Sequence, residues 1–362
     1  MGRKVYLLGA FPPPLHGMAY INASVRIELS KRRQAKITSL NIAPRNLSPS
    51  YVSRCIRFFY VCKEFFWFLL SAPIGVNSTL YVGLSGGMGQ LYEICFIAVA
   101  RIFKFSIFLH HHSFAYLNKP NCITRLMIKI SGKKARHIVL CKCMGQLLIN
   151  NYGSSLSTVT ISNAAIIDQP KHSRVKQYNL LKNIGFFGNI SEEKGIFLYI
   201  DIMDELNSRG VPVTGLIAGP FQDRRLQDLV FERISGKSYL RYLGSKYGDE
   251  KERFFDLLDV LVFPTRYVNE AEPLTILEVM SRGIPVLSIN RGCISEMIPS
   301  SAGVVLNDDP NVSIYAADNL MAWHCNPRLF SGLSKGALDT YLKLRNSNLA
   351  RFNALCGEII GS

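Results

Sequence analysis

Acidic residues are scarce in the first 165 residues of this 362-residue chain. Three acids, Glu28, Glu64 and Glu93, stand there against twenty Lys and Arg residues, whereas the rest of the chain carries twenty-two bases and twenty-three acids. The formal net charge of +16 therefore belongs to the N-terminal half. Such one-sided charge indicates a polyanionic partner for that half: a membrane surface, a phosphorylated ligand or a nucleic acid.

Long uninterrupted apolar runs are also missing. A membrane-spanning helix needs about 20 consecutive apolar residues, but charged residues break the runs at 54–75 and 92–109. Neither segment is therefore expected to span a membrane. The first run, RCIRFFYVCKEFFWFLLSAPIG, interleaves aromatic residues with bases. It fits either a helix in the headgroup region of an anionic membrane or a core helix with snorkelling bases.

The cysteine pattern argues against a disulfide framework. Nine cysteines, an odd number, are scattered along the chain, and no signal peptide is recognised in front of them. This usage indicates reduced thiols in a cytosolic protein. Cys141 and Cys143 are followed by no second pair at zinc-ligand spacing, so they are expected to be structural residues on a strand.

Short apolar strands alternate with helical patterns over most of the chain, which predicts an α/β fold with parallel sheets covered on both faces. The pattern loses its periodicity once, in a polar stretch before residue 180. We therefore expect an N-terminal domain at 1–167, a linker at 168–180, a second domain at 181–335 and a C-terminal helix at 336–362. The strands of both domains would end at a shared cleft.

The segment FFGNISEEKGIFLYI (186–200) reads as a strand, a polar loop and a helix. Gly188 and Asn189 follow the strand, and Lys194 stands where the helix should begin. A helix N-terminus with a neighbouring lysine suits a phosphate group. The alternative is a solvated lysine in an ordinary loop.

The segment VLVFPTRYVNEAEPLTILEVMSRGIPVLSI (260–289) repeats this design with carboxylates. Pro273 fits the first helical position and Gly283 the position that ends the helix. Leu274 and Thr275 would then present free backbone N–H groups, and Glu278 lies one turn further on.

Glu270 precedes this helix in the same segment. Carboxylates accept hydrogen bonds from paired hydroxyls, as on a sugar or a ribose. An acid that only stabilises the helix dipole would explain Glu272 better than Glu278.

These motifs, in this order, resemble the retaining glycosyltransferases of the GT-B fold, family 4 (glycosyl transferases group 1). The family signature has two glutamates with seven residues between them and then Gly-x-Pro-Val, here Glu270, AEPLTIL, Glu278, VMSR and GIPV. Its other elements are similar to Gly188 through Lys194-Gly195, YLGS (242–245), Asp259 to Thr265, PPPLHGMAY near the start and ISNAA (161–165). The resemblance implies two Rossmann-like domains facing a central cleft, with C-terminal helices packing back on the N-terminal domain. The N-terminal domain would face the membrane and bind the acceptor, and the second domain would bind the nucleotide sugar.

The resemblance also implies roles for individual residues. Glu278 would hold the ribose of a nucleotide sugar, and Glu270 would contact the donor sugar. Lys194 and Arg266 would neutralise the diphosphate, helped by the N–H groups of Leu274 and Thr275. Gly17 would let the first loop approach the diphosphate closely.

One residue departs from the family pattern. Many members have Arg directly after the glycine of the first phosphate-binding element, where this chain has Asn189 after Gly188. We expect Arg266 to supply the missing contact. An inactive member of the family is the alternative.

Three consecutive histidines in FLHHHSFAY (108–116) follow a predicted strand of the N-terminal domain. Neighbouring side chains on a strand point in opposite directions, so the three cannot easily share one zinc ion. The family often has a histidine here at the donor sugar, which implies His110 or His112. The alternative is a satisfied structural histidine. No cofactor and no metal are expected.

The predicted function is retaining transfer of a sugar from a UDP- or GDP-linked donor to a lipid-linked saccharide. It would serve assembly of a bacterial surface polysaccharide such as O-antigen, capsule or exopolysaccharide. The protein would be cytoplasmic and bound peripherally to the inner face of the cytoplasmic membrane, with no nucleic-acid partner. The alternatives are a GT-B nucleotide-sugar epimerase and a non-enzymatic basic protein that binds nucleic acid or a membrane.

Overall fold

The computed structural model describes residues 3–13, 16–32, 35–43, 51–72, 77–167 and 181–361, with the side chains of 51–54 left aside. The chain divides into two compact units, one formed by 1–167 with 345–362 and the other by 168–344. The expected linker at 168–180 lies outside the described residues. Each unit is described on its own below.

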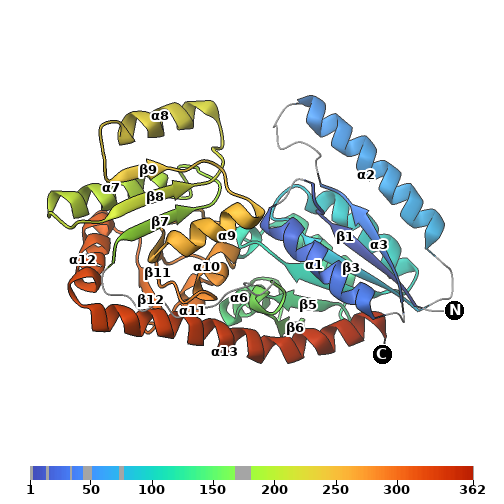
Figure 1. Ribbon diagram of the computed structural model, residues 1–362. Coiled ribbons are helices and arrows are strands. Elements are labelled where there is room, and N and C mark those ends of the chain that lie inside the picture. Colours follow the sequence, from blue (N-terminus) through green and yellow to red (C-terminus); the bar gives the residue numbers. More distant parts are fainter. Residues whose placement is uncertain are drawn as a thin grey trace. The chain divides into compact units, whose positions relative to one another are not determined.

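The N-terminal unit is built on a six-stranded parallel sheet with the order β2-β1-β3-β4-β5-β6 (Figure 1). Every residue of the central strand, STLYVGL, is buried, as expected for a parallel strand covered on both faces. The strands are β1 (Arg3–Gly9), β2 (Ala35–Asn41), β3 (Ser78–Leu84), β4 (Ser106–His111), β5 (Arg136–Val139) and β6 (Ser157–Thr160).

Helices connect these parallel strands. Their amphipathic patterns place one face of each on the sheet, as in α3, where Phe96, Ile97 and Ala100 are buried. The helices are α1 (Gly17–Lys31), α2 (Tyr51–Ser71), α3 (Gln90–Ile102), α4 (Ala115–Asn118), α5 (Cys122–Ser131), α6 (Lys142–Tyr152) and the short 3₁₀ turn η1 (Asn163–Ala165).

The last residues of the chain complete this unit. Helix α13 (Pro327–Ile360) begins in the other unit, and from Arg345 onward it belongs to the N-terminal one. Arg345 Nη1 donates to the carbonyl oxygens of Ala164 and Ile167 at 2.8 and 2.9 Å. Thr79 Oγ1 of β3 donates to the carbonyl oxygen of Ile359 at 2.8 Å.

The second unit has its own six-stranded parallel sheet, with the order β12-β11-β10-β7-β8-β9 (Figure 1). The strands are β7 (Asn183–Phe187), β8 (Thr214–Ala218), β9 (Leu240–Tyr242), β10 (Val260–Phe263), β11 (Val286–Ile289) and β12 (Gly303–Leu306). The helices are α7 (Ile196–Ser208), α8 (Arg224–Ile234), α9 (Gly248–Leu257), α10 (Leu274–Met280), α11 (Ile294–Met297) and α12 (Val312–Cys325).

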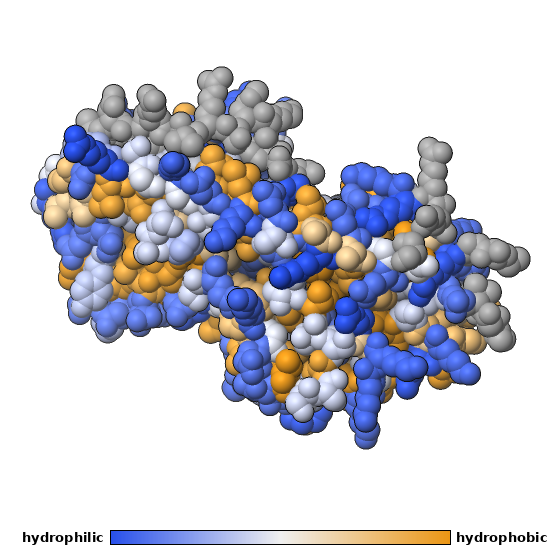
Figure 2. All heavy atoms as spheres, turned by 90° about the horizontal axis from the view of Figure 1, so that it is seen from below, coloured by the Kyte–Doolittle hydropathy of each residue, from blue (hydrophilic) through white to orange (hydrophobic). Residues whose placement is uncertain are grey.

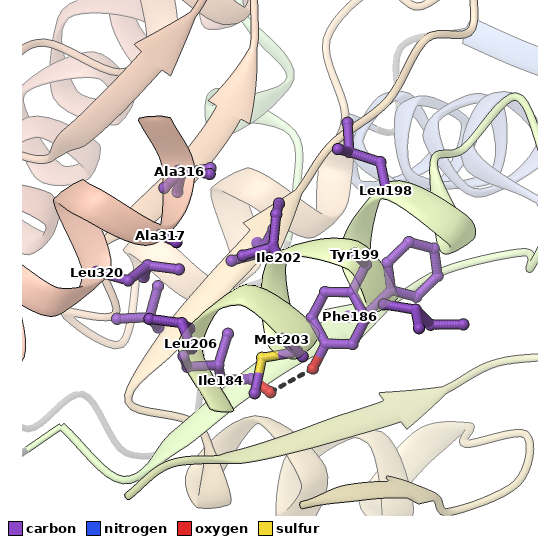
Figure 3. Close-up of a cluster of buried hydrophobic side chains, with 14 of the residues drawn as sticks. Ile184, Phe186, Leu198, Tyr199, Ile202, Met203, Leu206, Ala316, Ala317 and Leu320 are labelled. Carbon is purple, nitrogen blue, oxygen red and sulfur yellow. Dashed lines mark hydrogen bonds between the residues drawn. The ribbon is translucent and has the colours of Figure 1, made fainter. Parts of the chain in front are cut away.

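The core of this unit lies where α7 and α12 pack beside β7 (Figure 3). Ile202 and Leu206 of α7 lie in one buried cluster with Leu320 of α12. Tyr199 is fully buried, and its Oη donates to the Ile184 carbonyl oxygen at 2.7 Å. A buried hydroxyl with a partner avoids the desolvation penalty of an unpaired one.

The two sheets confirm the predicted α/β fold with two Rossmann-like units. The expectation that Cys141 and Cys143 lie on a strand is wrong, because β5 ends at Val139 and Cys141 caps α6, which contains Cys143. No helix in the described ranges is long and apolar enough to cross a membrane. On the face drawn in Figure 2, hydrophobic residues are interspersed among hydrophilic ones, which is normal for a folded surface.

Candidate active site

The loop after β7 brings Lys194 to the carboxyl end of β10. Gly188 opens the loop with φ +145°, and Gly195 closes it with φ +82° as the N-cap of α7. A Cβ at Gly195 would lie 2.0 Å from the Pro264 carbonyl oxygen, so only glycine permits this approach. Asn189 lies exposed in the same loop.

Lys194 and Glu270 form a close ion pair. Lys194 Nζ lies 2.5 Å from Glu270 Oε2, which also accepts a hydrogen bond from Thr265 Oγ1 at 3.1 Å. The Lys194 ammonium lies 4.9 Å from the ring centroid of Tyr267. The lysine side chain is 27% exposed and that of Glu270 is 10% exposed. Two predicted site residues, 76 positions apart, therefore meet in one half-buried cluster.

Arg266 stands beside this cluster in an ion pair of its own. Its backbone N–H donates to the Glu193 carbonyl oxygen at 2.8 Å, which ties the loop after β10 to the Lys194 loop. Its Nε lies 3.0 Å from Asp308 Oδ1, and Arg291 Nη2 lies 2.6 Å from Asp308 Oδ2. Arg266 is exposed, so a ligand phosphate can compete with Asp308 for it.

Helix α10 positions Glu278, Leu274 and Thr275. The helix begins at Leu274 and Pro273 is its N-cap, so the proline stands one residue earlier than expected. Leu274 and Thr275 form its first two positions, and both are half-buried. Glu278 Oε1 accepts from Lys251 Nζ of α9 at 2.7 Å.

Gly292 holds the loop before α10 in place. A Cβ there would lie 2.2 Å from the Glu270 carbonyl oxygen, and its φ is +53°. The N–H of Cys293 donates to the Ala271 carbonyl oxygen at 2.9 Å. The loop that carries Glu270 therefore rests directly on backbone that follows β11, with no room for a side chain between them.

In the N-terminal unit, His110 and His112 lie on one side of the end of β4. Their ring centroids are 4.0 Å apart, and a 2.5 Å hydrogen bond joins His110 Nδ1 to Tyr81 Oη. His111 points elsewhere and bonds Tyr116 Oη at 2.9 Å and His137 Nδ1 at 3.0 Å. This alternation follows from the pleat of a strand.

The imidazoles of this histidine group are neutral at pH 7. Burial, with the neighbouring imidazoles, holds the pKa of His110 and His111 well below the ordinary value. Burial lowers the pKa of His112 to about 3 and that of His137 to about 4. Within the described residues, Nε2 of both His110 and His112 is buried without a hydrogen-bond partner.

Gly17 begins α1, behind the N-cap His16, whose Nδ1 accepts from the Ala19 N–H at 3.4 Å. Burial lowers the pKa of His16. His16 also acts electrostatically on His112, so the first loop and the end of β4 converge. Gly17, His110 and His112 therefore belong to one edge of the N-terminal sheet, at the carboxyl ends of its strands.

Comparison with known proteins bears on the second unit. Residues 181–322 match the family model described as "Glycosyl transferases group 1". This range contains Lys194, Arg266, Glu270 and Glu278. The second unit holds a glycosyl transferases group 1 domain.

One curated relative of this group 1 domain is the sulfoquinovosyl transferase SQD2 of Arabidopsis thaliana, 31% identical over 112 residues. The match covers 31% of this chain and spans only about a fifth of the relative, 20% of its length.

Solved structures match the fold along the whole chain. HepE of Anabaena, determined with UDP, has a TM-score of 0.70 at 13% identity and covers 99% of both chains. The sucrose-phosphate synthase of Thermosynechococcus elongatus has a TM-score of 0.72 at 14% identity over 99% of both chains. WaaG, described as a glycosyltransferase involved in lipopolysaccharide biosynthesis, has a TM-score of 0.66 at 12% identity, covering 99% of this chain and all of its own. At this identity the likeness shows the fold, which is that of GT-B glycosyltransferases.

The sequence motifs did not predict several contacts in the group 1 domain. Asp308 joins Arg266 to Arg291, Lys251 pairs with Glu278, and Thr265 bonds Glu270. No sequence pattern marks Asp308 or Lys251 as site residues, because a single charged residue outside a motif is usually a solvent-exposed surface residue. Gly292 did carry a signal, since it is a glycine in the turn that follows a predicted strand.

The group 1 domain thus presents cations, carboxylates and hydroxyls at the carboxyl ends of β7 and β10. Cations can offset charge on a phosphate, and carboxylates can orient hydroxyls. Because Lys194 and Glu270 lie side by side, they can bind a phosphate and a hydroxyl at adjacent points of one ligand.

Proposed function

We propose that this protein is a retaining glycosyltransferase that moves a sugar from a nucleotide-sugar donor to a lipid-linked saccharide in bacterial surface polysaccharide assembly. The Lys194–Glu270 pair carries the proposal, because it places a cation and a carboxylate side by side within a glycosyl transferases group 1 domain. A UDP-bound structure of the same fold supports a nucleotide donor.

Lys194 and Arg266 would stabilise the negative charge that grows on the departing diphosphate, as preorganised cations do in other transfer reactions. Glu270 would exchange part of its bond with Lys194 for a donor-sugar hydroxyl. Glu278 would accept the ribose hydroxyls. Neutral His110 or His112 would hydrogen-bond the sugar through its Nε2, which has no partner among the described residues.

A binding assay and a transfer assay test this proposal. UDP and GDP are titrated separately while the melting temperature is followed, since a ligand that binds only the folded state raises it. We expect Lys194→Ala to weaken nucleoside-diphosphate binding by about 10-fold or more. Lys343→Ala, an exposed lysine of α13, is the matched control and should bind normally. A wild-type melting temperature that neither UDP nor GDP raises would refute the donor proposal.

Retention and metal independence are tested on the product. The anomeric configuration of the new bond, read by NMR, should equal that of the donor sugar. Added EDTA should leave the rate unchanged. Inversion of the anomer, or loss of activity that a divalent cation restores, would contradict the mechanism proposed here.

The membrane part of the proposal rests on α2. Phe59, Phe66 and Leu70 are 72%, 61% and 87% exposed, and their spacing puts all three on one face of the helix. Lys63, also exposed, lies on that face. An apolar stripe with a basic residue suits the headgroup region of an anionic membrane. This face would bring the enzyme to lipid-linked acceptors, which the N-terminal unit would bind.

A further inference from the structure

The end of strand β3 is held by two side chains of α3. Glu93 Oε1 accepts from the Ser85 N–H at 2.9 Å, and Gln90 Nε2 donates to the Ser85 carbonyl oxygen at 3.1 Å. Gln90 is in turn fixed by Thr124 of α5, whose Oγ1 donates to Gln90 Oε1 at 2.6 Å. Both backbone groups of Ser85 are thus set by side chains of the first helical turn.

Ser85 opens a glycine-rich loop, Ser85–Gly89, beside the histidine group. A Cβ at Gly86 would meet Ser113 Oγ at 2.4 Å, and one at Gly89 would meet Ser85 Oγ at 2.5 Å. Leu84 pairs with His111 in the sheet, so the next residues, Ser85 and His112, leave the same edge together. The loop position therefore depends on how Ser85 is held.

Gly87 differs from its neighbours because the fold does not require a glycine there. A Cβ would meet no atom within 4 Å, and its φ lies outside the left-handed region. It is exposed, as is Met88. An open, side-chain-free position at the carboxyl edge of a parallel sheet suits close approach of a ligand.

Glu93 is an unusual group to find in this place. Its side chain is fully buried, and within the described residues its Oε2 has no hydrogen-bond partner. Burial raises its pKa to about 7, although the bond from Ser85 and the charge of Arg57 act to lower it. A buried carboxyl with one unpartnered oxygen destabilises the folded protein, which points to a use beyond stability.

Arg57 connects Glu93 to helix α2. Its guanidinium lies 5.4 Å from the Tyr92 ring centroid, and its Nε donates to the Ile42 carbonyl oxygen after β2 at 3.2 Å. The other groups around Glu93 carry no charge at neutral pH: Tyr116 of α4, whose pKa burial raises, and Gln90 with its partner Thr124. Arg57 is therefore the charged group that acts on Glu93.

We propose that Glu93 is a positioning residue that holds the Ser85–Gly89 loop for acceptor binding, and that Arg57 of α2 sets its charge. The ionised carboxylate accepts the Ser85 N–H more strongly than a neutral carboxyl does. Protonation of Glu93 removes its charge and loosens the loop. Because Arg57 belongs to α2 and favours the ionised carboxylate, the position of α2 affects when Glu93 is protonated. The inference rests on the proposed function in one respect, the assignment of the acceptor to the N-terminal unit.

Hydrogen exchange measured by mass spectrometry on peptides that cover Ser85–Gly89 tests the positioning directly. After correction for intrinsic exchange, protection of the wild-type loop should rise about fivefold from pH 6 to pH 8.5. Glu93→Gln keeps an amide oxygen for the Ser85 N–H but should give a flat profile. Arg57→Gln should move the midpoint to higher pH. Glu28→Gln, at a half-buried acid of α1 paired with Lys31, is the matched control and should behave as wild type.

Kinetics test the link to the acceptor. With an isoprenyl-diphosphate-linked monosaccharide as the probe, the wild-type KM for acceptor should fall between pH 6 and pH 8.5, whereas Glu93→Gln should show no such change. The KM for donor should be unaffected. A pH-independent loop, or equal profiles for wild type and Glu93→Gln, would overturn this inference while leaving the proposed function intact. A wild-type protein that binds no nucleotide and transfers no sugar would refute the proposed function, whatever the exchange data show.

Discussion

Lys194 Nζ lies 2.5 Å from Glu270 Oε2, across a gap of 76 positions in the chain. The pair joins the loop after β7 to the loop after β10. Thr265 Oγ1 donates a hydrogen bond to the same Glu270 Oε2. Glu270 is the more buried partner, at 10% side-chain exposure against 27%. The two residues therefore form one structural unit and should respond to mutation together.

Removal of one partner should destabilise the second unit. Lys194→Ala leaves the Glu270 carboxylate buried with only the Thr265 hydroxyl, so we expect a loss of about 1–3 kcal/mol in the free energy of unfolding. The double variant Lys194→Ala/Glu270→Gln should recover part of it. A double-mutant cycle by urea denaturation measures the coupling. Additive effects would show that the pair does not act as a unit.

Gly292→Ala and Gly332→Ala should change stability in opposite directions. At Gly292 a Cβ would overlap the Glu270 carbonyl oxygen and φ is +53°, so we expect a loss of about 2 kcal/mol or more. Gly332 lies exposed in α13, with open space around its Cβ position. There alanine should stabilise the helix by about 0.5–1 kcal/mol. Thermal denaturation of both variants decides this.

The stability of wild type relative to Glu93→Gln should fall as the pH rises. The pKa of Glu93 is raised from 4.5 to about 7 in the folded protein, so the folded state binds the proton more tightly than the unfolded state. The difference should change by about 3 kcal/mol between pH 4.5 and pH 7 and then level off. Denaturation of both proteins across pH 4–9 measures it. A difference that is constant with pH would contradict the buried position of Glu93.

None of His110, His111, His112 and His137 should titrate between pH 5 and pH 8, because each pKa is lowered below this range by burial. Imidazole NMR resonances of histidine-labelled protein, assigned by single His→Asn variants, should stay constant across that range. An imidazole of this group that titrates near pH 6.5 would show that it is exposed to water.

Membrane attachment should depend on the exposed face of α2. The triple variant Phe59→Ser/Phe66→Ser/Leu70→Ser should lose most of its co-flotation with phosphatidylglycerol vesicles, because it removes three exposed apolar side chains. Leu229→Ser, at an exposed leucine of α8 in the other unit, is the matched control. Equal flotation of the two variants, or flotation of wild type that is insensitive to salt and to anionic lipid, would count against a membrane role.

The periodic segments predicted the fold, and the lysine and glutamate motifs predicted two residues that the structure brings together, Lys194 and Glu270. The segment 186–200 contains the expected strand, loop and helix, and the helix begins at Ile196, two residues later than expected. Pairing partners could not be read in this way. Nothing local in the sequence says that Lys251 meets Glu278, or that Arg57 acts on Glu93, because such contacts depend on sheet order and helix packing. In the sequence Glu93 belongs to no motif and is only one of three acids in a basic half.

Helix α13 has a consequence for the order in which the chain folds during synthesis. Thr79, Arg136 and Arg32 of the N-terminal unit bond Ile359, Glu358 and Asn353, which are synthesised after the strands of both sheets. The first 167 residues therefore cannot reach their final form while they are being made, although domains generally fold as they emerge. A nascent chain stopped near residue 340 should carry a finished second unit and an N-terminal unit still open to protease, a reversal of the usual sequence of events.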